Sequence, residues 1–130
     1  MSNVPAELSY TSEHEWVSAL TAEGTVRVSI TDHAQDALGD VVYVDLPSVG
    51  DSVAAEDSFG EIESTKSVSD LFAPIAGEIV AVNEGLEDDP ALVNSDPYGE
   101  GWIIEIRPEN ADDLANLLDA EAYKAELAKL

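Results

Sequence analysis

Cysteine is absent from all 130 residues of the sequence. Disulfide bonds, zinc–thiolate sites and cysteine nucleophiles are therefore excluded, and any redox-active sulfur must come from a cofactor. No apolar run approaches the ~20 residues that a membrane-spanning helix requires. Residues 1–5 lack both the basic and the apolar segment of a signal peptide. These features predict a cytoplasmic protein.

Basic residues are scarce, with five Lys plus Arg against 28 Asp plus Glu and a formal net charge of −23. Phosphate backbones and anionic bilayers would be repelled, so neither nucleic acid nor a membrane is expected as a partner. The simplest interpretation is a well-solvated monomer. The alternative is an acidic surface that steers the chain toward basic patches on protein partners.

Motifs for metal binding and hydrolysis are also missing. The two histidines, His14 and His33, do not have the spacing of a zinc-binding helix. The acids lack the spacing of a calcium loop, and there is neither a phosphate-binding glycine loop nor a Gly-x-Ser-x-Gly turn. We therefore assign no catalytic residue and no metal ligand.

Short β-rich segments separated by Gly and Pro predict a mainly β barrel or sandwich. The predicted strands cover residues 15–20, 25–30, 41–46, 59–64, 67–73, 77–83, 91–94 and 102–106, and residues 49–53 are predicted to form a turn into a further short strand. One short helix is predicted over residues 31–40, with Thr31 or Asp32 as its N-cap and Gly39 at its C-terminus. Residues 84–90 are expected to form an acidic loop or a single helical turn.

The whole chain, residues 1–130, is predicted to be a single domain. Residues 1–7 are expected to form a loose arm, residues 8–106 the β core and residues 109–130 two C-terminal helices. Asn110 or Asp112 can begin the first of these helices, and Asp119 can cap the second.

Lys66 stands alone among acidic residues, because no other Lys or Arg occurs between Arg27 and Arg107. Small hydroxyl residues flank it on both sides, and three acids lie slightly farther away: Glu61, Glu63 and Asp70. These acids favour the ammonium form, so catalysis by the free amine is not expected. An exposed lysine at a hairpin tip could instead enter another enzyme's active site and be acylated. An ordinary solvated surface lysine remains the alternative.

Several strings of residues resemble the glycine cleavage H proteins, the lipoyl-carrying components of the glycine cleavage system. The resemblance extends over nearly the whole chain. The matching strings are Ser12-Glu13-His14-Glu15-Trp16-Val17, Ile30-Thr31-Asp32-His33-Ala34-Gln35, Val44-Asp45-Leu46-Pro47, Gly60-Glu61-Ile62-Glu63-Ser64-Thr65-Lys66 with Ser69-Asp70, and Asn94-Ser95-Asp96-Pro97-Tyr98.

This resemblance implies a barrel-sandwich hybrid of the lipoyl/biotinyl type, with N-terminal strands, one short internal helix and C-terminal helices. It implies a non-catalytic carrier with lipoate in amide linkage to Lys66. The carrier would take an aminomethyl group from a pyridoxal-phosphate glycine decarboxylase to a tetrahydrofolate-dependent aminomethyltransferase. It would then pass reducing equivalents to a dihydrolipoyl dehydrogenase. Lipoylating enzymes would have to modify Lys66 before any of these steps.

The acids that flank the tip, Glu61, Glu63 and Asp70, would serve as recognition marks for the acylating enzyme. The resemblance also implies a cleft that shelters the loaded arm. By position, Glu15 and Asp70 correspond to residues that line this cleft. Glu13 stands where the family commonly has a small hydroxyl residue. An exposed strand carboxylate is the alternative interpretation of Glu15.

Two other functions remain compatible with the same residues. The chain could relay lipoyl or octanoyl groups to other enzymes, because the residues around Lys66 would be the same for that role. It could also be an acidic interaction domain in which Lys66 is unmodified.

Overall fold

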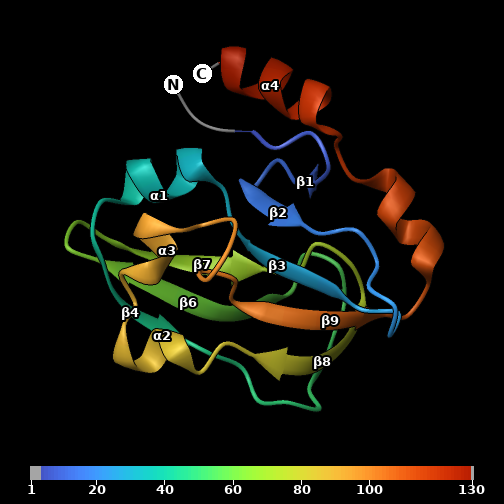
Figure 1. Ribbon diagram of the computed structural model, residues 1–130, viewed down its shortest axis with the longest axis horizontal. Coiled ribbons are helices and arrows are strands. Elements are labelled where there is room, and N and C mark those ends of the chain that lie inside the picture. Colours follow the sequence, from blue (N-terminus) through green and yellow to red (C-terminus); the bar gives the residue numbers. More distant parts are fainter. Residues whose placement is uncertain (1–3, 130) are drawn as a thin grey trace.

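The computed structural model describes residues 4–129, and β-strands dominate them, as predicted from the sequence (Figure 1). The strands form two antiparallel sheets with helices at their margins. In chain order the elements are β1 (Ser9–Tyr10), β2 (Glu15–Val17), β3 (Val26–Ile30), α1 (Asp32–Leu38), β4 (Val41–Asp45), β5 (Ser52–Val53), β6 (Ser58–Ser64), β7 (Val68–Phe72), β8 (Gly77–Val82), α2 (Gly85–Asp88), α3 (Leu92–Ser95), β9 (Ile104–Pro108), the 3-10 helix η1 (Ala111–Asn116) and α4 (Ala120–Ala128).

The larger sheet has six strands in the order β1-β2-β3-β9-β8-β5. On β3 the side chains of Val26, Val28 and Ile30 are buried, whereas that of Arg27 is exposed. The apolar side chains follow the period-two alternation that the sequence shows, although Ser29 is also buried, where its hydroxyl donates to the Gly101 carbonyl at 2.8 Å. Because β9 pairs with both β3 and β8, a strand from late in the chain joins the N-terminal strands to the middle of the molecule.

The smaller sheet has three strands in the order β4-β6-β7. Strands β6 and β7 form a hairpin, and residues 65–67 are its tip. Val44, Ile62 and Leu71 from the three strands are buried against the rest of the protein. The hairpin that carries Lys66 is therefore held by the core at its base, and the residues at its tip are exposed.

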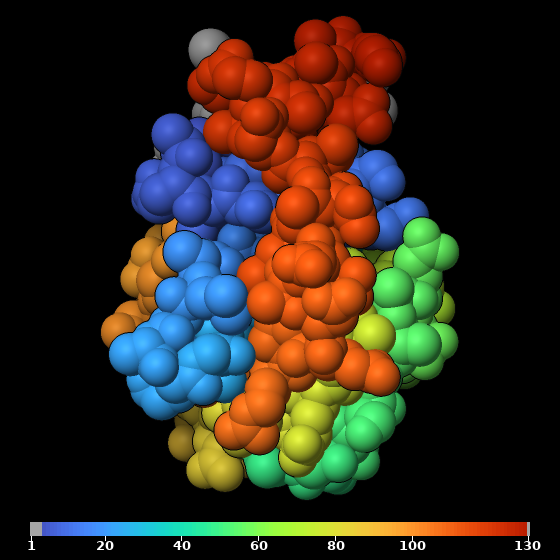
Figure 2. All heavy atoms as spheres, turned by 90° about the vertical axis from the view of Figure 1, so that its right-hand side faces the viewer, coloured from blue at the N-terminus to red at the C-terminus, as the bar shows by residue number. Residues whose placement is uncertain are grey.

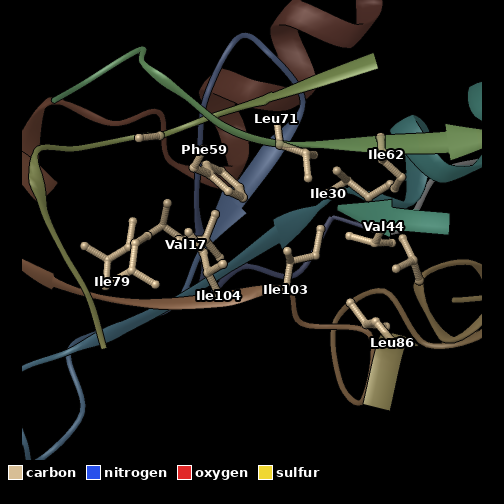
Figure 3. Close-up of a cluster of buried hydrophobic side chains, with 14 of the residues drawn as sticks. Val17, Ile30, Val44, Phe59, Ile62, Leu71, Ile79, Leu86, Ile103 and Ile104 are labelled. Atoms are coloured by element: carbon tan, nitrogen blue, oxygen red, sulfur yellow. The ribbon is translucent and has the colours of Figure 1, made fainter. Parts of the chain in front are cut away.

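The larger of two hydrophobic clusters fills the space between the two sheets (Figure 3). The larger sheet contributes residues such as Val17, Ile79 and Ile104, and the smaller sheet contributes Val44 and Ile62. Burial of one such side chain stabilises a protein by about 1.5–3 kcal/mol relative to its exposure. Each sheet therefore depends on the other for the burial of its inner face.

Helix α1 begins and ends at the residues predicted from the sequence. The Thr31 hydroxyl accepts a hydrogen bond from the Ala34 amide at 3.2 Å and caps the N-terminus. Gly39 follows the C-terminus with φ of 80°, a conformation that favours glycine. The chain then turns directly into β4, so the end of α1 lies next to the smaller sheet (Figure 1).

The C-terminal helices also begin at predicted caps, because Asn110 caps η1 and Asp119 caps α4. Helix α4 packs over β1 and β2 at the N-terminal end of the larger sheet (Figure 1). The rings of Tyr10 on β1 and Tyr123 on α4 stack with their centroids 4.7 Å apart. A second, smaller cluster of buried residues thus joins the two ends of the chain.

Three predicted elements need correction. The predicted strand over residues 91–94 is wrong, because this segment forms helix α3. A short apolar run cannot by itself distinguish a strand from a helical turn. Helix α2 is the single helical turn that was one of the two expectations for residues 84–90, so the described chain has α2 and α3 as internal helices besides α1.

The strand predicted over 15–20 ends at Val17, and the strand predicted over 102–106 begins only at Ile104. Near the latter, the Asn83 side-chain amide donates to the Trp102 carbonyl at 2.8 Å.

The N-terminal residues that the structure describes are in contact with the second cluster. Residues 1–3 of the expected loose arm lie outside the described part of the chain. Val4 packs against the second cluster, and the Pro5 carbonyl accepts a hydrogen bond from the Tyr10 hydroxyl at 2.6 Å. These two residues are therefore held rather than loose.

Candidate functional site

The Lys66 turn is braced by one hydroxyl group. The Ser64 Oγ accepts hydrogen bonds from the backbone amides of Lys66 at 3.2 Å and Ser67 at 3.1 Å. The Ser64 amide also donates to the Ser67 carbonyl at 2.8 Å. Ser64 is buried while Lys66 is exposed. The small hydroxyl residue that precedes the turn therefore fixes its shape.

The tip is also attached to the segment that joins α1 to β4. The Thr65 amide donates to the Asp40 carbonyl at 3.0 Å. The Asn94 side chain on α3 holds the same segment. Its Oδ1 accepts a hydrogen bond from the Val41 amide at 2.8 Å, and its Nδ2 donates one to the Gly39 carbonyl at 2.9 Å. These bonds place Lys66 at a defined position relative to α1.

Gly39 allows the Lys66 side chain to lie against this segment. A Cβ atom at position 39 would lie 3.3 Å from the Lys66 Cε and 3.7 Å from the Thr65 Oγ1. With its positive φ, the position therefore favours glycine for two independent reasons. The aliphatic part of Lys66 runs along the end of α1.

The predicted recognition residues Glu61, Glu63 and Asp70 are all exposed and lie on β6 and β7 below the tip. Glu61 is directly opposite Asp70 across the hairpin. Within residues 4–129, none of the ion pairs includes these acids or Lys66. Their charges are therefore directed to solvent and are available to a partner.

Glu15 and Asp70, the two residues predicted for an arm cleft, line one cavity of about 300 Å³ beside the hairpin. The cavity lies between α1, the segment 13–15 and strands β6 and β7. Its other lining residues are Glu13, His14, Ile30, His33, Ala34, Ala37, Leu38, Ile62, Ser69 and Leu71. The lining is mostly apolar, with carboxyl and imidazole groups at a few points.

The Glu15 side chain is buried, with 3% exposure, so the alternative of an exposed strand carboxylate is wrong. Its Oε2 accepts a hydrogen bond from the Phe72 amide at 2.8 Å, whereas its Oε1 is buried without a hydrogen-bond partner in the described part of the chain. Burial raises the pKa of the Glu15 carboxyl to about 8, although the Phe72 hydrogen bond opposes this shift. The carboxyl is therefore mainly protonated at neutral pH.

The role of α1 as a cleft wall was missed in the sequence. Ala34, Ala37 and Leu38 have the i, i+3, i+4 spacing of one helix face, and none of them is fully buried. This spacing of apolar residues on a short helix is the sequence pattern that could have indicated the cleft wall.

The two histidines lie together in the same wall. Their ring centroids are 4.8 Å apart, and His14 Nδ1 is 2.9 Å from the Tyr123 hydroxyl on α4. Burial lowers the pKa of His14, and the neighbouring His33 lowers it further. The Tyr123 hydroxyl is also 2.8 Å from the Thr31 Oγ1 at the start of α1, so α4 is tied to the cleft.

A glycine cleavage H-protein family model matches residues 8–130. The chain belongs to this family. It is 61% identical over 127 residues to the glycine cleavage system H protein of a Psychrobacter species, covering 98% of this chain and all of that protein. It is 62% identical over 131 residues to the Mycolicibacterium vanbaalenii glycine cleavage system H protein, covering 98% and 99%.

A solved structure agrees with this assignment. The crystal structure of a glycine cleavage system H protein from Mycobacterium marinum superimposes with a TM-score of 0.88 at 47% identity, covering 96% of this chain and 99% of that one. Members of the H-protein family carry a lipoyl-lysine, and the chain is a lipoyl carrier of the glycine cleavage system rather than a catalyst. The predicted family, fold and carrier role are confirmed.

Membrane-spanning helices and metal-binding clusters are both absent from residues 4–129. No helix there is long and apolar enough to cross a membrane. No group of three or more His, Asp or Glu side chains there is placed to bind a metal ion.

The described chain has a second cavity of about 420 Å³ on the other side of Glu15. It lies between residues 10–13, the segment 72–75 and the C-terminal elements, on the face that Figure 2 shows, where the orange C-terminal segment passes between the blue and green parts. Glu15 therefore forms part of the wall of both cavities.

Proposed function

We propose that Lys66 is the lysine of this H-protein-family chain that carries lipoate. The observation that carries this proposal is its position at an exposed hairpin tip that Ser64 and the Asp40 carbonyl hold in a defined shape. A rigid tip can enter the active sites of several partners in turn, because no rearrangement of the hairpin is needed. The chain would act as a single lipoyl-carrier domain over residues 1–130.

The residues near Lys66 fit a lipoyl group. The mostly apolar cavity of about 300 Å³ adjoins the end of α1, along which the Lys66 side chain runs. The buried Oε1 of Glu15 has no partner among the described residues, so the wall has an unused polar group. Glu15 and Asp70 would line the cleft for the folded-back arm, and exclusion of water there would protect a labile cargo.

Lipoate would supply a dithiolane that accepts the cargo and is later reoxidised by thiol–disulfide exchange. The chain's residues would position and shelter it. The Glu15 carboxyl, protonated at neutral pH, can lose its proton when a cationic group enters the cleft, because a nearby positive charge lowers the pKa of a carboxyl.

The partners that we propose follow from this role. The chain would carry an aminomethyl group from the pyridoxal-phosphate glycine decarboxylase to the tetrahydrofolate-dependent aminomethyltransferase, and reducing equivalents to the dihydrolipoyl dehydrogenase. Lipoylating enzymes would modify Lys66 first, with Glu61, Glu63 and Asp70 as recognition residues. We place this activity in the cytoplasm and expect a monomer, since net charge of −23 opposes self-association.

The intact mass of the protein purified from its own cells tests the proposal. We expect the mass of one added lipoyl group, and we expect Lys66→Arg to abolish both this addition and carrier activity. Lys124→Arg, an exposed lysine on α4, is the matched control and should still be modified. The proposal fails if the wild type is wholly unmodified where the lipoylating enzymes are present, or if Lys66→Arg still gains the group.

A further inference from the structure

Three acids form a row across the outer face of the smaller sheet. Asp45 on β4 is directly opposite Glu61 on β6, and Glu61 is directly opposite Asp70 on β7. All three side chains are exposed, and none takes part in an ion pair of residues 4–129. Like charges that are directly opposite destabilise a sheet. This row therefore costs stability without compensation inside the described protein.

The larger sheet shows the opposite arrangement of cross-strand charges. Arg27 is directly opposite Glu105, with 3.7 Å between their charged groups. Glu78 is directly opposite Arg107, with 3.9 Å between them. The fold can therefore pair its charges across strands, and the acidic row of the smaller sheet is left unpaired in the same molecule.

Exposed apolar side chains lie beside the acidic row, nearer to Lys66. Tyr43, which is 54% exposed, and Val68, which is 55% exposed, are on either side of Glu63 across the three strands. A β-bulge between Val41 and Tyr43 leaves Val42 exposed as well. Three of the five exposed large hydrophobic residues found in the described chain lie in this sheet: Val42, Tyr43 and Val68.

We call Tyr43 and Val68 the apolar row, and Asp45, Glu61 and Asp70 the acidic row. We propose that the outer face formed by both rows, here called the Lys66 face, docks the enzyme that acylates Lys66. That enzyme would present an apolar socket to Tyr43 and Val68 and a strip of Lys or Arg side chains to Asp45, Glu61 and Asp70. The inference rests on the proposed acylation of Lys66 and adds the surface that selects the acylating partner.

The spacing of the two rows suits such a partner. The rows are two residues apart along the strands, which is about 7 Å, and the apolar row is the one closer to the tip. A protein that covers both rows would have Lys66 at the edge of its contact. Tyrosine is enriched in the buried centres of interfaces, and unpaired acids accelerate the encounter with a basic surface.

The chemical step that follows docking is the transfer of an acyl group from an activated donor to Lys66. The Lys66 ammonium loses one proton to solvent, and its Nζ then forms an amide bond with the carbonyl carbon of lipoyl adenylate. The bond from that carbon to the AMP oxygen breaks, and the second Nζ proton leaves with AMP. ATP supplies the adenylate. No residue of the Lys66 face takes part in the bond exchange, so changes there should alter binding rather than the chemical step.

Initial rates of lipoylation of the unmodified chain by a purified lipoate–protein ligase, with lipoate and ATP, test the proposal. We expect Tyr43→Thr and Val68→Thr each to raise KM by about tenfold with little change in kcat. Both variants keep a residue that favours strands, and thermal unfolding would check that they remain folded. Val49→Thr and Leu20→Thr change equally exposed apolar residues elsewhere and should leave KM unchanged.

A salt series tests the acidic row separately. The double variant Asp45→Asn/Glu61→Gln should show a weaker fall of kcat/KM with rising salt than the wild type. The control Glu23→Gln/Glu109→Gln removes the same charge from exposed positions outside the face. Docking on this face is overturned if the variants of both rows behave like their controls while the wild type is modified. A wild type that the ligase does not modify overturns the proposed function and the docking together.

Discussion

The two sheets of this H-protein-family chain use charge in opposite ways. In the larger sheet, Arg27 and Arg107 each lie opposite a glutamate, and Arg27 also lies 4.6 Å above the centre of the Trp102 ring. In the smaller sheet the cross-strand row is entirely acidic. Charge in the first sheet is satisfied within the chain, whereas charge in the second faces outward, next to Lys66.

The two sheets therefore have separate roles. Most of the chain's few basic side chains are ion-paired on the larger sheet and on α4. Lys66 is left exposed at the tip of the smaller sheet, and no ion pair of residues 4–129 includes it. A sheet that is stabilised by the shared core can tolerate such local repulsion, because single surface pairs contribute only about 0.2–1 kcal/mol.

Glu15 joins the two sheets, since it lies on β2 of the larger sheet and accepts from Phe72 on β7 of the smaller one. Its folded-state pKa is raised to about 8, so folding takes up a proton between the unfolded pKa near 4.5 and pH 8. The stability associated with this group is therefore greatest below pH 4.5 and is lost as pH rises to 8. Glu15→Gln should remove that loss.

We expect the difference in free energy of unfolding between Glu15→Gln and the wild type to increase in favour of the variant as pH rises from 5 to 8. The increase should be up to about 1.4 kcal/mol per pH unit. Urea unfolding at several pH values would measure this gain. Glu23→Gln changes an exposed carboxyl that does not contribute to the Glu15 shift, so it should retain the pH dependence of the wild type. A constant difference between Glu15→Gln and the wild type across this range would contradict a buried, protonated Glu15.

The features that sequence analysis located best depend on neighbouring residues. Thr31, Asn110 and Asp119 were recognised as caps because a cap bonds to an amide two or three residues away. The hairpin around Lys66 was predicted for a similar reason, since both of its strands and its turn are continuous in the chain.

Features that depend on distant residues were not predictable. The burial of Glu15 depends on Phe72, which is 57 residues away, and on the packing of one sheet on the other. The cleft wall formed by α1 likewise depends on where the hairpin lies. The short segment 91–94 was assigned to a strand because four residues are too few to show a period.

Gly39 offers a test of how closely the smaller sheet's tip depends on α1. Its φ of 80° and ψ of −160° lie in a region that only glycine adopts readily, so Gly39→Ala should cost about 1–3 kcal/mol. The new Cβ would also press on the Lys66 side chain. Gly24→Ala is the matched control, because Gly24 has φ of 78° and nothing within 4 Å of an added Cβ.

Both glycine variants should lose stability, as chemical unfolding would show. We expect slower modification of Lys66 for Gly39→Ala and an unchanged rate for Gly24→Ala, measured under conditions where both are folded. Equal rates for the two variants would show that the contact between Gly39 and Lys66 does not affect access to the lysine.

The smallest expected effect is that a glutamate-to-lysine substitution changes the free energy of unfolding with opposite sign in the two sheets. Glu61→Lys places a cation between Asp45 and Asp70 and should stabilise the protein by about 0.5 kcal/mol, whereas Glu105→Lys places a cation opposite Arg27 and should destabilise it by a similar amount. Each change also reduces the net negative charge, so Glu23→Lys in an exposed turn measures that general contribution.

Urea unfolding would compare the free energies of unfolding. That of Glu61→Lys should be higher than that of Glu23→Lys, and that of Glu105→Lys should be lower. Glu61→Lys should nevertheless slow the modification of Lys66, since it removes a charge that the acylating partner is proposed to contact. A variant that is more stable and yet a poorer substrate would show that the acidic row is kept at a cost to the fold for the sake of recognition. If Glu61→Lys instead lowered stability, the row would have an internal role, and the contrast between the two sheets would not hold.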